Sequence, residues 1–370
     1  MSRLNELIQQ YCPDGVEYKY LGEFCEIKTG KGITKKDSDE NGNYPIISGG
    51  ITPMGYYHTF NREGNTVTIS RVGANAGLVS FIDKRFYLND KCFSVIPSDD
   101  TNTKFLYYVL SARENEIKGT QSEGGVPTIN TQKVGSIVIP VPPLPVQEEI
   151  VRILDTFAEL QAELQAELQK RLQQYNYYRD NLLSFEGRTD VEWKKLEDCC
   201  QILDNKRKPI TKGARVAGEY PYYGANGVQD YVANYIFDGK YVLVGEDGSV
   251  ITPSGTPVVN WAEGKIWVNN HAHIISEKKG VLLRYLFHYL QTINITPLIH
   301  GNIPKLTGGD FRALTIPVPP LPVQEEIVRI LDRFSTLTTD ITAGLPAEIE
   351  ARRKQYEYYR DQLLTFKQKA

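Results

Sequence analysis

Long apolar segments are scarce in this 370-residue sequence. The apolar run Val281-Leu282-Leu283, for example, ends at Arg284, far short of the ~20 apolar residues that a membrane-spanning helix needs. The opening residues, MSRLNELIQQ, are polar and lack the apolar stretch of a secretory signal. This pattern argues against a membrane protein and against an exported one.

Cysteine is scarce as well. The five cysteines are odd in number and form no C-x-x-C pair, which argues against a disulfide framework and a structural zinc site. They are Cys12, Cys25, Cys92, Cys199 and Cys200. Free thiols are typical of a reducing compartment, so we expect a cytoplasmic protein.

Neither sign of charge dominates, because 42 basic residues against 45 acidic ones leave a net charge of −3. The overall charge therefore does not indicate a nucleic-acid partner, and any such site must be local. With 41% hydrophobic and 24% charged residues, the composition is that of a globular protein. The length predicts about two to three domains.

Catalytic motifs are missing too. The sequence has no G-x-x-x-x-G-K-[ST] nucleotide loop, no G-x-G-x-x-G after a strand, and no N-P-P-[YF] segment of the kind found in adenine methyltransferases. We interpret the glycine-containing run at 73–77 as a turn. His271 and His273 form an H-x-H pair without a third ligand in view, so we interpret them as packed or surface residues.

A nuclease could be sought in Asp247 with Glu263 and Lys265, an acid followed by an E-x-K triplet. The same triplet also occurs at 17–19 and at 192–194, so chance explains it. We therefore expect no catalytic residue, no metal site and no cofactor in this chain.

An internal repeat is the strongest signal that is present. The 17-residue segment IPVPPLPVQEEIVRILD occurs identically at 139–155 and 316–332. QYNYYRDNLLSF at 174–185 matches QYEYYRDQLLTF at 355–366 in 9 of 12 positions. Weaker similarity links 16–27 with 191–202. Three smaller pairs are Tyr44-Pro45 with Tyr220-Pro221, Asn89 with Asn269, and Pro127 with Pro304. Each copy is a variable part of roughly 120 residues followed by a nearly constant tail.

The first constant tail predicts a long helix. The prolines at 142, 143 and 145 predict an extended entry, and apolar residues then recur about every 3.6 positions. They are Ile150, Leu154, Phe157, Leu160, Leu164, Leu168, Leu172, Tyr175, Tyr178 and Leu182. A helix over 146–185 would be ~60 Å long and needs a partner, for which its own copy at 323–366 is the obvious candidate.

The two tails differ in their middle. Gly344-Leu345-Pro346 predicts a break in the second helix, whereas the first tail repeats AELQ three times over 158–169. Each tetrad would add ~6 Å of helix, which makes it a natural unit for changing a spacer. Ordinary coiled-coil sequence is the alternative, and both interpretations stay open.

The variable parts predict mixed α/β domains. Strands are expected at 66–70, 93–96 and 241–244, and short helices at 105–111 and 285–291. The fold class is therefore α+β, with two mixed α/β domains and two long helices arranged as an internal repeat.

A basic loop follows the first strand of each variable part, and both loops contain an I-T-K core. Lysines and arginines on glycine- and proline-rich loops are suited to phosphate contacts. The predicted DNA-binding residues here are Lys28, Lys31, Lys35 and Lys36, and Lys206, Arg207, Lys208, Lys212 and Arg215. Arg71, at the end of a strand, could bind a guanine edge, and VGEDGS at the matching place lacks an arginine. Solvated surface residues are the alternative.

The sequence resembles the specificity (S) subunits of type I restriction–modification systems. The resemblance is carried by the I-P-x-P-P-L-x-x-Q helix entries, the long helix, the closing Q-Y-x-Y-Y-R-D-x-L-L segments and the opening CPDGVEYKYLGE, and it covers essentially the whole chain. It implies a target recognition domain over 1–140, a spacer helix over 141–187, a second recognition domain over 188–317 and a second spacer helix over 318–370. The two helices would pair antiparallel and hold the domains apart.

The resemblance also implies partners. Each domain would read one half of a split sequence in double-stranded DNA, and two modification (M) subunits would dock on the helices. S-adenosylmethionine, ATP and Mg would belong to these M subunits and to the restriction (R) subunits. We predict that the M subunits contact the helix entries, at Pro142, Pro143, Gln147, Pro319, Pro320 and Gln324. A plain helix-start turn is the alternative for these prolines, and a non-catalytic coiled-coil adaptor is the alternative function.

Overall fold

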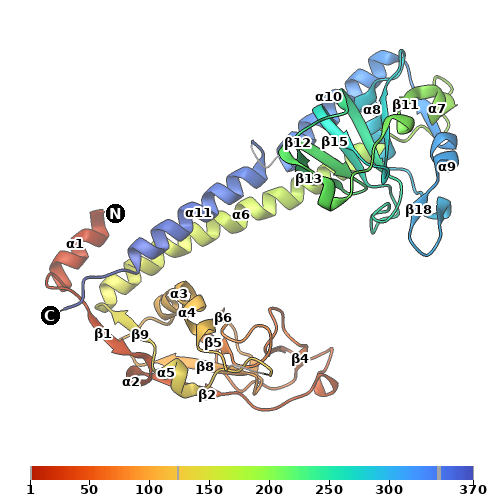
Figure 1. Cartoon of the computed structure of the whole chain (residues 1–370). Helices are drawn as coiled ribbons and strands as arrows, with labels where there is room; N and C mark the ends of the chain where they lie inside the picture. The colour runs from red at the N-terminus through yellow and green to blue at the C-terminus, as the bar shows by residue number, and fades with distance from the viewer. Residues whose placement is uncertain (1, 123–124, 340–342, 370) are drawn as a thin grey trace. The chain divides into compact units, whose positions relative to one another are not determined.

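The computed structural model describes residues 2–122, 125–339 and 343–369. The chain forms two compact units (Figure 1). The first unit comprises residues 1–165 together with 349–370, and the second comprises 166–348. Among the described residues, no helix is both long enough and apolar enough to cross a membrane.

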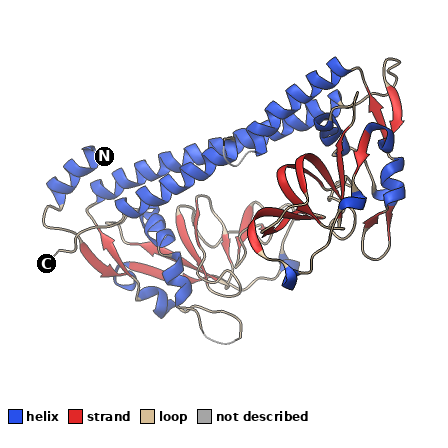
Figure 2. Cartoon of the chain, turned by 45° about the horizontal axis from the view of Figure 1, so that its top comes forward, coloured by secondary structure: helices blue, strands red, loops and turns tan. Residues whose placement is uncertain are grey.

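The first unit is built on small sheets flanked by short helices (Figure 2). A four-stranded sheet has the order β2-β8-β5-β6, a three-stranded sheet has the order β4-β3-β7, and β1 pairs with β9. The elements are α1 (Ser2–Tyr11), β1 (Glu17–Tyr20), α2 (Leu21–Phe24), β2 (Cys25–Thr29), η1 (Lys35–Asp37), β3 (Tyr44–Ile47), β4 (Tyr56–Tyr57), β5 (Thr66–Ser70), β6 (Val79–Ile82), β7 (Tyr87–Leu88), β8 (Cys92–Pro97), α3 (Thr103–Ala112), α4 (Glu114–Gly119), α5 (Thr131–Gly135) and β9 (Val138–Val141).

The second unit has a larger sheet of six strands in the order β11-β16-β14-β15-β12-β13. Its remaining strands pair as β10 with β19 and β17 with β18. The elements are β10 (Glu192–Lys195), α7 (Leu196–Cys199), β11 (Cys200–Ile202), η2 (Asp204–Lys206), η3 (Lys212–Ala214), β12 (Ala217–Gly224), β13 (Gly227–Val232), β14 (Phe237–Gly245), β15 (Val259–Val268), β16 (Ala272–Glu277), α8 (Leu283–Leu290), η4 (Thr296–Leu298), β17 (Ile299–His300), β18 (Lys305–Leu306), α9 (Gly308–Ala313) and β19 (Thr315–Val318). The predicted strands and helices of both variable parts are confirmed.

The predicted long helix is α6 (Leu144–Leu182), which begins two residues before the expected Val146 and ends before the expected Phe185. Its 39 residues correspond to ~58 Å of helix. In the first unit, Phe157 of α6 stacks on Tyr359 of α11 (Leu345–Leu363), with ring centroids 5.6 Å apart. In the second unit, Tyr178 of α6 stacks at 5.4 Å on Phe334 of α10 (Leu321–Thr339).

The pairing is antiparallel in each unit, as expected. In the first unit, Leu154 belongs to the same core cluster as Leu363 and Leu364, while Phe157 contacts the earlier Tyr356. The predicted break in the second tail is also confirmed, because α10 ends at Thr339 and α11 begins after Gly344. Residues 340–342 lie outside the described part of the chain.

The end of the chain completes the first unit. The Val16 N–H donates to Lys367 O at 2.8 Å, and the Tyr18 hydroxyl donates to Phe366 O at 2.9 Å. In the second unit, the corresponding segment is the end of α6, whose Leu183 and Phe185 enter the core with Val191. The ends of the two repeated QYxYYRDxLL segments therefore pack into the core of their units in the same way.

Each copy of the constant segment is fixed to its variable domain by one aspartate. In the first unit, Lys104 Nζ lies 2.7 Å from Asp155 Oδ2, and the Tyr108 hydroxyl donates to Asp155 Oδ1 at 2.6 Å. In the second unit, Arg284 Nε lies 2.7 Å from Asp332. His288 takes the place of the tyrosine and donates from Nε2 to Asp332 at 2.6 Å. The geometry is shared although the donors differ.

This difference makes the stability of the second unit dependent on pH. His288 is fully buried, and its Nδ1 has no hydrogen-bond partner among the described residues. Burial lowers the pKa of His288 below its ordinary value of 6.5, in spite of the opposing effect of Asp332. When the pH falls below about 6.5, this histidine takes up a proton in the unfolded chain before it does so in the folded unit. Acidification therefore favours unfolding.

His288→Tyr, which copies Tyr108, should therefore reduce the loss of stability between about pH 7 and about pH 5, because tyrosine does not titrate there. Urea unfolding of the full chain measures the free energy of unfolding at both pH values. His300→Asn is the control, since the His300 side chain is 57% exposed. An equal loss of stability in wild type and His288→Tyr would contradict the assignment.

Candidate nucleic-acid interface

The same backbone hydrogen bonds join three segments at the end of a central strand in both units. In the first unit, the Arg71 N–H donates to Lys91 O at 2.9 Å, the Gly73 N–H to Pro127 O at 3.0 Å and the Ile129 N–H to Arg71 O at 2.8 Å. We call these segments the strand-end frame, defined as residues 70–73, 89–91 and 127–129 here and residues 245–248, 269–271 and 304–306 in the second unit.

The frame of the second unit repeats these bonds at matching positions. The Glu246 N–H donates to His271 O at 2.8 Å, the Gly248 N–H to Pro304 O at 3.0 Å and the Leu306 N–H to Glu246 O at 2.9 Å. The weak sequence similarity between Pro127 and Pro304 therefore marks a structural equivalence.

A buried asparagine shapes each frame. Asn89 and Asn269 are 1% and 2% exposed. Each side-chain Oδ1 accepts the N–H two residues later, from Lys91 at 3.0 Å and from His271 at 2.8 Å. The side chains on the frames nevertheless differ. Val72, Lys91 and Thr128 are matched by Asp247, His271 and Lys305, and Arg71 is matched by Glu246, whose side chain is only 14% exposed. One backbone thus presents two unlike surfaces.

The two basic loops are anchored beside these frames. In the first unit, Asn89 Nδ2 donates to Ile33 O at 2.7 Å, inside the loop. In the second unit, Trp267 Nε1 donates to Lys208 O at 2.6 Å. Exposed lysines therefore lie on a loop tied to the frame in the first unit and on a loop tied to β15, next to the frame, in the second. Combined phosphate and base contacts require such an arrangement.

The structure separates the predicted DNA-binding residues into two groups. The exposed ones are Lys28, Lys31, Lys35, Lys36, Lys206, Lys208 and Lys212. Lys28 lies on β2 and not in a loop, and it forms an ion pair with Glu26. Arg71 is half-buried, with its guanidinium over the Phe93 ring and NH1 donating to Asp90 O at 3.3 Å. DNA contact by the accessible residues stays a prediction.

Two of the predicted DNA-binding arginines form ion pairs inside the second unit. The Arg215 side chain is 15% exposed, forms an ion pair with Asp230 at 3.2 Å and lies over the Tyr222 ring. The Arg207 side chain is 12% exposed, and its NH1 lies 2.6 Å from Glu246 and donates to Ala272 O at 2.6 Å. Internal carboxylates pair with both guanidinium groups, so these two arginines are less suited to phosphate contacts than the exposed lysines are.

Arg207 is part of a buried cluster that the sequence did not reveal. Asp204, Glu246 and His273 bring their ligand atoms within 4.8 Å of one another. His273 Nδ1 lies 2.7 Å from Asp204 Oδ2, and Nε2 lies 3.1 Å from Leu306 O. Both ring nitrogens of His273 therefore lie within hydrogen-bond distance of an oxygen atom.

Ion pairs hold the cluster together. Arg207 NH1 lies 2.6 Å from Glu246, and Lys305 Nζ lies 3.7 Å from the same side chain. Burial raises the pKa of Asp204, but the hydrogen bond from His273 and the charges around it outweigh burial and hold the pKa below its ordinary value. His273 is thus packed in the core, as the sequence interpretation had it.

Arg207→Ala should destabilise the second unit by about 3 kcal/mol, because it leaves Glu246 without its closest cation in a buried site. Lys206→Ala, one residue away on an exposed side chain, should change stability by no more than ~0.5 kcal/mol. Chemical denaturation of the full chain measures both. Equal stabilities for the two variants would show that Arg207 is not part of the core.

The predicted partner surface also needs correction. Gln147 and Gln324 are fully buried. Gln147 accepts the Asn102 N–H at 2.8 Å and donates to Pro142 O at 2.6 Å, and Gln324 makes the same contacts with Leu282 and Pro319. These glutamines hold the helix entry inside each unit, so they cannot touch a partner. Pro142 and Pro319 are buried as well, whereas Pro143 is half-buried and Pro320 is exposed.

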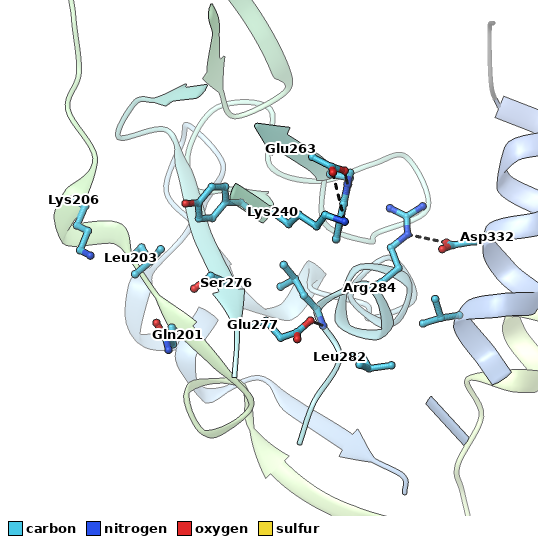
Figure 3. Close-up of a pocket in the computed structure, with 14 residues that line it drawn as sticks. Gln201, Leu203, Lys206, Lys240, Glu263, Ser276, Glu277, Leu282, Arg284 and Asp332 are labelled. Carbon is cyan, nitrogen blue, oxygen red and sulfur yellow. Dashed lines mark hydrogen bonds and ion pairs between the residues drawn. The ribbon is translucent and has the colours of Figure 1, made fainter. Parts of the chain in front are cut away.

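A cavity of about 1000 Å³ lies in the second unit beside the Asp332 contact (Figure 3). Two ion pairs lie on its wall, Lys240 with Glu263 at 3.4 Å and Arg284 with Asp332 at 2.7 Å. Glu263 and Lys265, the residues of the nuclease hypothesis, do not form a catalytic group with Asp247. Asp247 lies instead beside His271, with which it shares a hydrogen bond.

A family model described as the type I restriction modification DNA specificity domain matches residues 13–174 and again residues 189–351. This chain belongs to that family. The two matches follow the internal repeat. The protein therefore recognises DNA sequence with two domains, and its role is specificity and not catalysis.

Individual relatives agree with this assignment. The EcoR124I/EcoR124II specificity subunit of Escherichia coli is 29% identical over 420 residues, covering 99% of this chain and 97% of that protein. A Haemophilus influenzae protein described as a type I restriction enzyme specificity subunit is 43% identical over 181 residues, or 48% of this chain and 46% of that protein. The S subunit of M. genitalium shares the fold, with a TM-score of 0.65, 18% identity and coverage of 94% of this chain and 95% of that chain.

Proposed function

We propose that this chain reads a split target in double-stranded DNA, with each unit contacting one half-site through its own strand-end frame and basic loop. The observation that carries the proposal is the recurrence of the same three backbone hydrogen bonds beneath unlike side chains. Phosphate contacts position a protein on DNA, whereas side chains at base edges supply the sequence information. A common frame with different side chains therefore suits two different half-sites.

The exposed lysines supply the phosphate contacts in this proposal. Lys206, Lys208 and Lys212 are exposed in the second unit, and Lys31, Lys35 and Lys36 are exposed in the first. Each cation that neutralises a phosphate releases a counterion, so binding weakens with salt by a predictable slope. The net charge of −3 does not oppose this, because the cations are gathered locally.

The double variant Lys206→Glu with Lys208→Glu should lower DNA affinity at least about tenfold and flatten the salt dependence by about two phosphate contacts. The measurement is a salt titration of binding by the complex of this chain with the methyltransferase subunit of its system. Lys279→Glu is the control, since this lysine is exposed in the same unit but lies outside the basic loop.

Two outcomes of this titration decide between the hypotheses. A loss confined to the double variant supports the proposed DNA contact. Unchanged affinity and unchanged salt slope would contradict the basic-loop assignment and favour a coiled-coil adaptor, whose functions do not depend on these lysines.

The constant helices are the proposed docking sites for the methyltransferase (M) and restriction (R) subunits. Tyr177 and Tyr358 stand at the same position of the repeated segment and are 67% and 62% exposed. Exposed aromatic side chains are enriched at protein interfaces. S-adenosylmethionine, ATP and Mg would be bound by those subunits. Two like copies of the helix surface would suit two M subunits.

A further inference from the structure

A cavity of about 550 Å³ opens at the strand-end frame of the second unit. Four parts of the chain form it, namely the β12–β13 hairpin, the loop after β14, the frame segment of His271 and the segment of Ile303 and Lys305. Its polar lining residues are Asn226, Gln229, Asp247, Ser249, His271 and Lys305. None of these residues was among the DNA-binding residues expected from the sequence.

The amide of Gln229 is held in a defined place at the edge of this cavity. Asn269 Nδ2, buried in the frame, donates to Gln229 Oε1 at 3.3 Å. Gly224 leaves room for the amide, because a Cβ at that position would lie 2.0 Å from Gln229 Nε2. The frame that fixes the backbone therefore also orients a side chain that lines the cavity.

Asp247 is the acidic group of the cavity. Its side chain is 25% exposed and shares a hydrogen bond with Nδ1 of His271, whose side chain is 49% exposed. Since Nδ1 of His271 engages Oδ1, the other carboxylate oxygen of Asp247 keeps its capacity to accept hydrogen bonds. The backbone of Lys305 pairs with that of Asp247. Lys305 also lines the cavity, and its side chain, 46% exposed, lies with Nζ 3.7 Å from Glu246.

A carboxylate on a DNA-binding surface repels phosphates, so it serves recognition only where a base offers a donor. Exocyclic amino groups in the major groove are such donors, and Asp accepts from them. We propose that Asp247, held by His271, accepts a hydrogen bond from the exocyclic amino group of a cytosine or an adenine in the half-site of the second unit. This inference rests on the proposed function and names one of its base contacts.

The first unit provides an internal comparison. Val72 occupies the position of Asp247, and Lys91 occupies that of His271, in a frame with the same backbone hydrogen bonds. That frame therefore has a valine in place of the carboxylate and a lysine in place of the histidine. The two half-sites should therefore differ at the base pair that this position reads.

The test is the methylation motif of cells that carry the chain with its methyltransferase subunit, determined for wild type, Asp247→Val and Asp247→Asn. Valine copies the first unit, and asparagine keeps a hydrogen-bonding group. Both should relax or change the preference at one position of one half-site by about tenfold or more, with the other half-site unchanged. The identity of the altered base distinguishes cytosine from adenine.

Asp238→Asn is the matched control, because it removes one exposed negative charge from the same unit outside the cavity. An unchanged motif in both Asp247 variants, with methylation retained, overturns the inference, and so does an equal loss at every position. Thermal unfolding of each variant shows whether the second unit remains folded. Failure of the proposed function is distinct, since wild type would then yield no two-part motif at all.

Discussion

Three backbone hydrogen bonds at the end of a central strand determine how each unit presents its surface. Because main-chain N–H and C=O groups form them, they place no demand on the side chains of the residues involved. Gly73 and Gly248 share the bond to a proline carbonyl, with φ of 95° and 81°, a backbone conformation that glycine adopts easily. The backbone path is fixed, and the side chains at positions such as 71 and 246 are left to vary.

By contrast, each variable domain is attached to its helix through side chains. Gln147 and Gln324 are buried and use their side-chain amides to bind the backbone of the variable domain. Asp155 and Asp332 use their carboxylates. These contacts depend on particular side chains, and they lie in the segment whose 17 residues are identical in the two copies. The identical segment of the repeat therefore carries the side chains that attach each variable domain to its helix.

Much of the fold was predictable from residue patterns. The apolar period identified α6, Gly344 and Pro346 identified the break before α11, and the pairs Asn89 with Asn269 and Pro127 with Pro304 identified equivalent frame positions. The functional site was predicted less well, because burial of a charged side chain depends on residues distant in sequence. Nothing near Arg207 in the sequence indicates Glu246 as its partner, and a glutamine after a proline-rich entry gave no sign that it would be buried. Asp247 and His271 came together only through the frame.

The most direct measurement of the central claim is the methylation motif produced in cells by the wild-type chain and its methyltransferase subunit, determined by long-read sequencing. Two units with the same frame and unlike side chains predict one split motif whose two specified parts differ in sequence. An uninterrupted motif, or a split motif with two identical parts, would contradict the account.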